Sequence, residues 1–338
     1  MTVGLFGWYH KGNFGDDLMA MMLTRELLGR GYEVMLWGIE TKQAEQWGAE
    51  ASHEVDSFLT SIDVLVFGGG GLLANAHVRD DFDHLVERVV QEASSRGVPV
   101  HGVSLGGDGT LSPDSISRGR STLLEHVSLL TVRNRQDVSD VAQFGVQAHF
   151  HHDIVWTCPQ YLSSDPTTTR SFSKSNRTIV NVEEKSFYRK TFLFILQLAM
   201  CLAPNFHLEH LSIIREDGDF HTLQKQAEDY GLADYTPYSG VKETLNKIIK
   251  ADFLISSKMH IGMCALAMGI PFVSVFGEEK TRVMMEAVGV DRFFVGNRPM
   301  KSFKTLFGVF SDSGSLRQSF DEEKRDAQGH VERLVAVL

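Results

Sequence analysis

IDVLVFGGGG, at residues 62–71, is a short apolar run that leads directly into four glycines. A run of this length, rich in β-branched residues, predicts a strand that is buried on both faces, as in a parallel sheet. Successive glycines cost backbone entropy, so they are expected where the chain turns with positive φ or where a ligand approaches the backbone. The stretch therefore predicts a buried parallel strand followed by a ligand-facing loop.

The order of strand, glycine-containing loop and helix repeats on both sides of this stretch, which is typical of an α/β fold with right-handed crossovers. Apolar runs predict strands at residues 2–6, 33–37, 62–67, 98–105, 129–133, 178–182, 208–214, 252–256 and 271–276. Helical spacing of apolar residues predicts helices at residues 16–28, 81–95, 136–144, 186–202, 220–230, 241–249, 259–268, 281–287 and 316–338. The expected fold class is thus α/β with parallel sheets.

The chain is expected to form two domains, because its 338 residues exceed the roughly 150 residues of a typical domain. The polar residues 163–176 (SSDPTTTRSFSKSN) are the best candidate for a linker. We expect a Rossmann-like domain over residues 1–165, a linker over 166–177 and a second Rossmann-like domain over 178–338 that includes the terminal helix. Ligands of open α/β sheets bind beyond the carboxyl ends of the strands. The expected site is therefore a cleft that both domains face.

The composition excludes several classes of protein. The net charge of −10 argues against a broad nucleic-acid-binding surface, so no nucleic acid partner is expected. The cysteines lie far apart, at Cys158, Cys201 and Cys264, without a C-x-x-C pair. Neither a zinc ribbon nor a disulfide framework is therefore predicted, and a reducing cytoplasm fits best.

Neither a membrane span nor a metal site is predicted. The N-terminal segment lacks the features of a signal peptide. The longest apolar run, residues 192–203, is too short to cross a bilayer and predicts a buried helix. A peripheral membrane contact through residues 187–202 is the alternative. His149, His151 and His152 lie together, but their spacing fits no zinc pattern.

Three loops after the N-terminal strands are expected to face a ligand. At residues 12–17 (GNFGDD), Asn13 can cap the next helix and the two carboxylates suit its first turn. The backbone N–H groups of this loop can also face a ligand, and both functions can hold at once. GGDGT, at residues 106–110, resembles the phosphate-binding motif of NAD kinases and diacylglycerol kinases. The candidate substrate-binding residues of the three loops are Asn13, Gly15, Asp16, Asp17, Gly69, Gly70, Gly71, Gly106 and Gly107.

Two further loops carry candidate cations. Arg133 ends a strand in TVRNR, and its planar fork suits a phosphate or a carboxylate. In SSKMH, Lys258 and His260 precede an apolar helix, which places a cation, an imidazole and the positive end of a helix dipole together. That combination predicts an anion site with a titratable acid beside it. Lys280 is a third candidate cation, and Asp153, at the end of the predicted short strand HHDIVW, is a candidate binding residue.

Taken together, these loops resemble the polysaccharide pyruvyl transferase family. The matching segments, in order along residues 4–290, are GNFGDDL, VFGGGGLL, VSLGG, TVRNRQDVSDVAQFGV, HHDIVW and ISSKMHIGMCALAMGIPFVSV. The resemblance implies a fold similar to the two-domain glycosyltransferases of the GT-B type. It also implies a transferase of exopolysaccharide biosynthesis, which moves the pyruvyl unit of phosphoenolpyruvate onto a sugar of a polysaccharide or its precursor and forms a pyruvate ketal.

The resemblance also implies three catalytic residues and a binding residue by their positions in the family's motifs. Arg133 matches the arginine of the V-R-D motif, which is implicated in phosphoenolpyruvate binding, although Asn134 follows it here instead of Asp. His260 matches the histidine of the R-x-H motif and is the implied acid. Lys258 stands where that motif usually has arginine, so it keeps the charge without the fork. Lys280 matches a lysine near the donor phosphate.

The implied reaction needs no cofactor, because phosphoenolpyruvate is a co-substrate. The implied partner is a sugar acceptor, either an oligosaccharide or a polysaccharide, and lipid-linked and nucleotide-linked forms are both open. The expected location is the cytoplasm, at the inner face of the membrane where the acceptor is lipid-linked; the oligomeric state is open. The alternatives are a GT-B glycosyltransferase that uses a nucleotide sugar, a GGDGT-type kinase, and a non-catalytic saccharide-binding relative, which Lys258 suggests.

Overall fold

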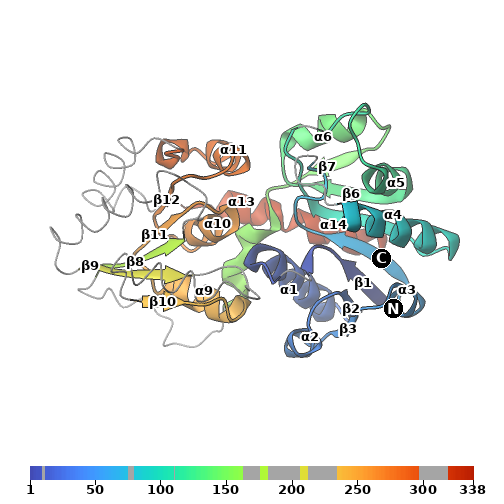
Figure 1. Ribbon diagram of the computed structural model, residues 1–338, viewed down its shortest axis with the longest axis horizontal. Coiled ribbons are helices and arrows are strands. Elements are labelled where there is room, and N and C mark those ends of the chain that lie inside the picture. The colour runs from blue at the N-terminus through green and yellow to red at the C-terminus, as the bar shows by residue number, and fades with distance from the viewer. Residues whose placement is uncertain are drawn as a thin grey trace. The chain divides into compact units, whose positions relative to one another are not determined.

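The chain contains two compact units (Figure 1). Unit 1 comprises Met1–Thr157 and Asp321–Leu338, and unit 2 comprises Cys158–Phe320. Each unit has one parallel β-sheet with helices. The computed structural model describes residues 1–9, 12–74, 80–109, 111–162, 176–181, 206–211, 234–296 and 319–338.

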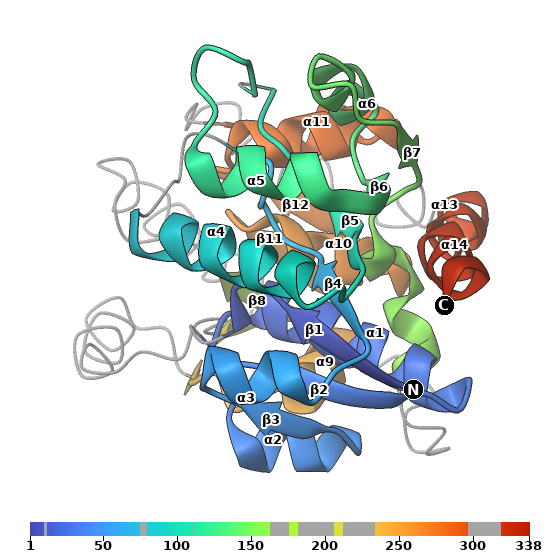
Figure 2. The same cartoon turned by 90° about the vertical axis from the view of Figure 1, so that its right-hand side faces the viewer.

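Unit 1 has a seven-stranded sheet in which all pairings are parallel, in the order β3-β2-β1-β4-β5-β6-β7. The strands are β1 (Thr2–Phe6), β2 (Glu33–Trp37), β3 (Glu50–Ser52), β4 (Val64–Gly68), β5 (Val100–Leu105), β6 (Val127–Val132) and β7 (Ala148–Phe150). The helices between them are α1 (Phe14–Gly29), α2 (Thr41–Trp47), α3 (Val55–Thr60), α4 (Asp80–Ser95), α5 (Arg118–His126) and α6 (Arg135–Ala142). Figure 2 shows α4 and α5 side by side over one face of this sheet.

The sheet of unit 1 forms because its central strands are apolar on both faces. Strands β1, β4 and β5 are buried along almost their whole length. In the core, Phe6 stacks on Trp37 with ring centroids 5.7 Å apart and meets Phe67 edge to face at 5.1 Å. Such buried rings contribute a large apolar area to folding. The parallel α/β architecture that the strand–glycine pattern predicts is therefore confirmed.

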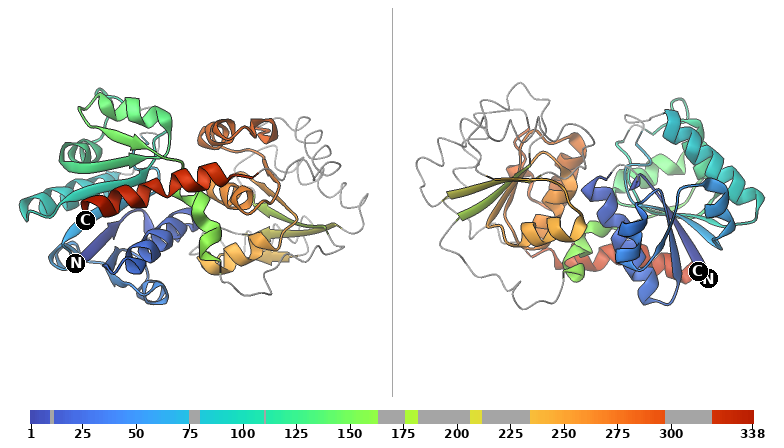
Figure 3. Two further views of the ribbon diagram at one scale, coloured as in Figure 1. Left: turned by 180° about the vertical axis from the view of Figure 1, so that it is seen from behind. Right: turned by 60° about the horizontal axis from the view of Figure 1, so that its bottom comes forward.

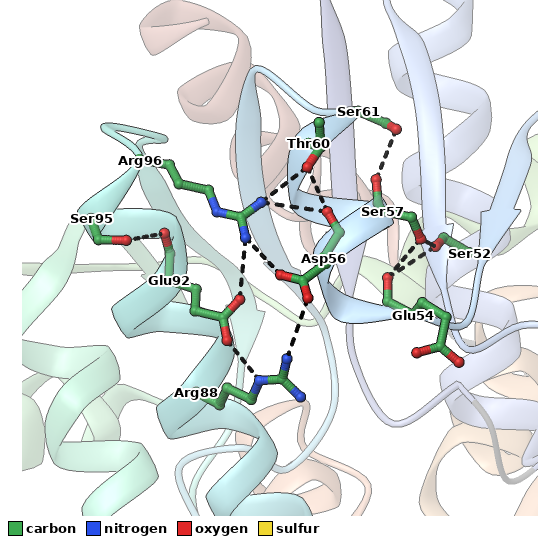
Figure 4. A network of polar contacts seen from close by, with 10 residues as sticks. All are labelled: Ser52, Glu54, Asp56, Ser57, Thr60, Ser61, Arg88, Glu92, Ser95 and Arg96. Carbon is green, nitrogen blue, oxygen red and sulfur yellow. Dashed lines mark hydrogen bonds and ion pairs between the residues drawn. The ribbon is translucent and has the colours of Figure 1, made fainter.

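A polar network on the surface joins α3 to α4 (Figure 4). Arg96 Nη2 donates to Asp56 Oδ1 at 2.7 Å, and Arg88 Nε donates to Glu92 Oε1 at 2.6 Å. The Asp56 side chain is 74% exposed, so water and salt screen these ion pairs. The network therefore adds little to stability.

We expect Asp56→Ala to lower the Tm by no more than about 3 °C, because exposed ion pairs are weak. The effect should shrink when the salt concentration is raised. Thermal unfolding followed by circular dichroism at low and high salt measures both quantities. A Tm loss above about 10 °C would show that the network stabilises unit 1 far more than screened pairs can.

The C-terminal segment belongs to unit 1, which corrects the expectation that a single terminal helix completes the second domain. It forms two helices, α13 (Asp321–Ala327) and α14 (Gly329–Val337). Helix α14 packs against β5 and β6, and Figure 3 shows it beside the strands of unit 1. Its amphipathic pattern predicts a sheet-covering helix, but such a stripe suits either sheet, so the sequence does not specify which one it covers.

The described residues of unit 2 form a five-stranded parallel sheet in the order β10-β9-β8-β11-β12. The strands are β8 (Asn176–Asn181), β9 (Phe206–Leu211), β10 (Asp234–Thr236), β11 (Phe253–Ser256) and β12 (Phe272–Ser274). The helices described between residues 234 and 296 are α9 (Val241–Ile249), α10 (Met259–Ala267), α11 (Glu279–Ala287) and the 3-10 helix η4 (Asp291–Phe293). Helix α10 is apolar on nearly all sides and packs against β11 and β12.

A buried carboxylate ties β8, β9, β10 and α9 together. Glu209 accepts hydrogen bonds from Arg177, Lys247 and Thr236 Oγ1, the last at 2.8 Å. Burial alone would raise the pKa of Glu209, but the bonds from Lys247, Arg177 and Thr236 outweigh it and lower the pKa to about 2. Glu209 is therefore ionised under ordinary conditions and holds these elements in register.

The structure corrects the prediction around HHDIVW. This segment is not a strand: β7 ends at Phe150, and the 3-10 helix η2 (Ile154–Tyr161) follows. Asp153 Oδ1 accepts a hydrogen bond from Val155 N at 3.0 Å, which starts this helical turn. The sequence also missed α2, β3, α3, α5, β7 and β10.

Parts of the predicted organisation lie outside the described residues. These are the helices at 186–202 and 220–230 and most of the linker, whose last residues, Asn176 and Arg177, begin β8. The continuous part of unit 1 ends at Thr157, before the expected boundary at residue 165. Of the helices that the structure describes, none is both long and apolar enough to cross a membrane.

Candidate functional site

The loops that follow β4 and β5 lie side by side at the carboxyl edge of the sheet in unit 1. Gly106 N donates to Gly70 O at 2.9 Å, and Leu73 N donates to Gly106 O at 3.1 Å. Gly69 and Gly70 have φ of +72° and +84°, which glycine adopts without strain. A Cβ on Gly69 would lie 2.5 Å from Met19 Sδ. Gly69 and Gly70 are therefore required by the turn, and Gly69 also by close packing. Backbone atoms line this edge of the sheet.

Arg133 follows β6 and lies against this glycine edge. Its Nη1 donates to Asp153 Oδ2 at 2.7 Å, and the two side chains are only 6% and 5% exposed. A Cβ on Gly106 would lie 2.2 Å from Arg133 Nε, so only glycine leaves room for the guanidinium there. Asp153 and Gly106 together fix the plane of the fork. The structure thus brings together Arg133, Asp153 and Gly106, three of the residues that the sequence names as candidates for the site.

Asp137 is a buried carboxylate that the sequence reasoning missed. Its Oδ2 accepts hydrogen bonds from Gly107 N at 3.0 Å and from Asn134 Nδ2 at 2.9 Å. Burial raises the pKa of Asp137 to about 6, although the Gly107 bond, the charge of Arg133 and the Asn134 bond oppose the increase. A carboxyl group with a raised pKa therefore lies beside Arg133, the cation of this region. An acidic residue in the first turn of a helix usually indicates only dipole compensation, which hid this signal.

The N-terminus of α1 completes the described edge of unit 1. Asn13 Oδ1 accepts from Gly15 N at 2.9 Å and caps the helix, as one of the two interpretations predicts. A Cβ on Gly70 would lie 3.4 Å from Asp16 Oδ1, so Asp16 lies beside the glycine loop. Asp17 is fully buried. Of the two carboxylates, half-buried Asp16 therefore lies at the glycine turn, whereas Asp17 is enclosed in the protein.

Tyr9, which follows β1, is hydrogen-bonded to the end of β4, just before the glycine loop. Its hydroxyl donates to Gly68 O at 2.6 Å, and its side chain is buried. Burial, and then the charges of Asp16 and Asp17, raise the pKa of Tyr9 well above its usual range. Tyr9 is therefore a permanent hydrogen-bond donor that holds the end of β4 in place.

In unit 2, a buried hydrogen-bond relay supports the start of α10. Lys258 N donates to Ser256 Oγ at 2.8 Å, Ser256 Oγ donates to Asn181 Oδ1 at 3.2 Å, and Asn181 Nδ2 donates to Leu211 O at 2.8 Å. The relay connects the carboxyl ends of β11, β8 and β9. It fixes Lys258 as the N-cap residue of α10, with His260 half-buried in the first turn. The sequence predicted Lys258 and His260 here but not the supporting Asn181.

Lys280 lies near the start of α11, the helix that follows β12, the strand paired with β11. Its Nζ forms an ion pair with Glu278 Oε2 at 2.7 Å, and both side chains are 43% exposed. Solvent screens this pair, so Lys280 remains able to exchange Glu278 for another anion. Lys280 thus belongs to the same carboxyl edge of unit 2 as Lys258 and His260.

The described residues contain no cluster of histidine, cysteine, aspartate and glutamate side chains suited to a metal ion. Thr110, the last residue of GGDGT, lies outside the described residues. Gly71, in contrast to its neighbours, has open space where a Cβ would stand, apart from Ala74 at 4.0 Å. Each unit therefore carries part of the predicted site at the carboxyl edge of its own sheet.

Comparison with known proteins gives one family match. The sequence model of the family described as polysaccharide pyruvyl transferase matches residues 13–277. No curated protein sequence matches the chain.

Solved structures resemble the chain in fold at low sequence identity. The UDP-GlcNAc 2-epimerase of Methanocaldococcus jannaschii has a TM-score of 0.70 at 11% identity, with 99% of this chain and 100% of that chain covered. The UDP-GlcNAc 2-epimerase of Neisseria meningitidis bound to UDP-GlcNAc has a TM-score of 0.67 at 11% identity, with 99% of each chain covered. A glycosyltransferase of Rickettsia africae has a TM-score of 0.55 at 8% identity, with 99% and 97% covered. These similarities confirm the GT-B-like fold class.

Proposed function

Because the chain belongs to the polysaccharide pyruvyl transferase family, we propose that it transfers the pyruvyl unit of phosphoenolpyruvate onto a sugar of a polysaccharide or its precursor, and closes a pyruvate ketal. Phosphoenolpyruvate carries a carboxylate and a phosphate, so its binding requires cations with fixed geometry. The observation that carries the proposal is the Arg133 guanidinium, oriented by Asp153 and seated on Gly106. An oriented fork suits the two anionic groups of this donor.

The residues at the start of α10 supply the second part of the proposal. Lys258 contributes positive charge, and the N-terminus of the nine-residue helix adds the partial charge of its N–H groups. His260, in the first turn of the same helix, serves as the general acid. Lys280 binds the donor phosphate in exchange for Glu278. None of these roles requires a metal or a cofactor.

The proposed reaction balances in three steps. His260 in its protonated form gives its proton to the methylene carbon of phosphoenolpyruvate. The π electron pair of the C=C bond forms the new C–H bond and leaves positive charge at C2. A sugar hydroxyl attacks C2, forms the first C–O bond and returns a proton to His260. The bond between C2 and the phosphate oxygen then breaks, a second hydroxyl forms the second C–O bond, and its proton leaves with phosphate. Cations that strengthen their contacts as phosphate leaves lower the barrier.

Asp137 should make donor binding depend on pH. Above its pKa of about 6 the carboxyl is ionised and opposes an anionic donor at Arg133; below it the group is neutral. We expect Asp137→Asn to bind phosphoenolpyruvate more tightly than the unaltered protein above pH 6, with a KM ratio that approaches one below pH 5. Donor titration is common to both proteins, so KM measured between pH 5 and 8 isolates the carboxyl.

A neighbouring carboxylate provides the control for Asp137. Asp140 lies on the same helix and contributes only a small repulsion to Asp137. Asp140→Asn should therefore leave most of the pH dependence in place. If Asp137→Asn instead shows the same KM ratio at all pH values, its charge does not act on the donor.

Phosphate release with phosphoenolpyruvate and a panel of saccharides tests the proposed function. A matched screen measures the Tm with phosphoenolpyruvate, UDP and UDP-GlcNAc, since a ligand that binds the folded protein raises the Tm. We expect stabilisation by phosphoenolpyruvate and saccharide-dependent phosphate release. Stabilisation by UDP alone would favour a glycosyltransferase. Saccharide binding without phosphate release would favour a non-catalytic relative, and ATP-dependent phosphorylation would favour the GGDGT-type kinase.

A further inference from the structure

Helix α14 carries a histidine that contacts both chain segments holding the Arg133–Asp153 pair. His330 is fully buried. Its Nδ1 lies 2.7 Å from Thr131 Oγ1, and its Nε2 lies 3.0 Å from His152 O. Thr131 precedes Arg133 by two positions, and His152 directly precedes Asp153. One imidazole therefore joins the two segments that hold the ion pair.

The partners of His330 determine its tautomer and charge. A carbonyl oxygen only accepts, so Nε2 carries a hydrogen and donates to His152 O. Burial lowers the pKa of His330 to about 3, and the positive charge of His151 lowers it further. The charges of Asp153 and Asp326 act in the opposite direction but do not outweigh burial. The ring is therefore neutral, and its Nδ1 accepts from the hydroxyl of Thr131. Both ring nitrogens are therefore hydrogen-bonded, one to each segment.

A strained residue lies in the same network. Ser104, near the end of β5, has φ of +55°, a conformation that non-glycine residues rarely adopt. Its N donates to Thr131 Oγ1 at 3.0 Å, and its Oγ accepts from Ile154 N at 3.2 Å. Such strain persists only where surrounding contacts enforce it. Thr131 provides one of those contacts, and Ile154, the residue after Asp153, provides the other.

A second contact from the C-terminal segment holds the same stretch of chain. Asp326, in α13, accepts from His152 N at 2.7 Å and from His152 Nδ1 at 2.8 Å. Together with His330, it fixes the backbone of His152 from both its N–H and its C=O. Both helices lie beyond residues 13–277, the part matched by the family model.

We propose that the C-terminal helices form a clamp, made by His330 and Asp326, that sets the distance between Arg133 and Asp153 and so presents the Arg133 fork to the anionic donor. His330 is a positioning residue, because it acts through the hydroxyl of Thr131 and the carbonyl of His152. The role in donor binding rests on the proposed function, whereas the geometric role does not.

Variants of His330 test the clamp. His330→Phe keeps a ring but has neither nitrogen, whereas His330→Gln can still place an N–H near His152 O. Leu334→Ala is the matched control, because Leu334 is equally buried in α14 but belongs to its apolar stripe. Crystal structures of the three variants give the distance from Arg133 Nη1 to Asp153 Oδ2, and steady-state kinetics give KM for phosphoenolpyruvate and kcat separately.

We expect His330→Phe to lose the 2.7 Å contact between Arg133 and Asp153 and to raise KM at least about 10-fold with a smaller change in kcat. In His330→Gln, KM should lie between the values of His330→Phe and the unaltered protein. Leu334→Ala should keep both the Arg133–Asp153 contact and the KM of the unaltered protein, even if its Tm falls further. An unchanged contact in His330→Phe overturns the clamp. If the unaltered protein does not release phosphate from phosphoenolpyruvate, the proposed function fails and the structures alone judge the clamp.

Discussion

His260→Ala is expected to lower kcat by roughly 10²- to 10⁴-fold, the usual contribution of a positioned general acid. In the proposed reaction no carbon–oxygen bond forms until the methylene carbon of the donor receives a proton. Alanine offers no proton, so water would have to protonate a carbon atom that is a weak base. KM for phosphoenolpyruvate should change much less, because the proposal assigns donor binding to Arg133, Lys258 and Lys280.

The fold should tolerate this substitution. His260 is half-buried in the first turn of α10, and alanine is the best helix former. Lys258→Ala is the comparison within the same turn: it removes charge but no acid, so it should raise KM more than it lowers kcat. Steady-state kinetics with phosphoenolpyruvate and thermal unfolding measure these effects. Near-normal kcat in His260→Ala, with the fold intact, would mean that another group is the acid.

Arg133→Lys is expected to raise KM for phosphoenolpyruvate at least about 10-fold, although the charge is retained. Lysine cannot reproduce the planar fork that Asp153 and Gly106 orient. Lysine is preferred to alanine here, because alanine would remove the cation that neutralises the buried Asp153 carboxylate, at a cost of about 3–5 kcal/mol. Arg135→Lys, at the first residue of α6, is the matched control. Its guanidinium lies over the ring of Phe150, 4.3 Å from the ring centre, and KM should not change.

Gly106→Ala tests the same contact from the other side. The backbone of Gly106 does not have positive φ, so alanine is excluded only by its Cβ, which would meet Arg133 Nε at 2.2 Å. The guanidinium must then move, and KM should rise as it does in Arg133→Lys. If both variants bind phosphoenolpyruvate like the unaltered protein, Arg133 is not the donor-binding residue.

Much of the fold could be predicted because buried parallel strands have a strong local signal. The run at 62–67 became β4, and the glycines after it turn with positive φ. Edge strands such as β3 (Glu50–Ser52) and β7 (Ala148–Phe150) have only three residues each and little apolar character, so no pattern indicated them. The place of α14 could not be predicted, because the choice between two sheets depends on tertiary packing.

Candidate site residues could be predicted where they follow strands. Residues that only hold other site residues in place could not be predicted. Arg133 follows a strand and His260 begins the helix after one, and both lie in short charged segments that the local sequence marks. Asp137, Asn181 and His330 act through contacts between distant segments: His330 and Thr131 are 199 residues apart. A buried polar residue gains its role from such partners, and no spacing in the sequence names them.

The most direct test uses phosphoenolpyruvate labelled with ¹³C at C2, incubated with the protein and with free, lipid-linked and nucleotide-linked saccharides. Nuclear magnetic resonance then follows the labelled carbon, and a colorimetric assay follows phosphate. We predict that the label appears as a ketal carbon bonded to two sugar oxygens, in an amount equal to the phosphate released. If the label stays in phosphoenolpyruvate with every acceptor while UDP is released from a nucleotide sugar, the protein is a glycosyltransferase and not a pyruvyl transferase.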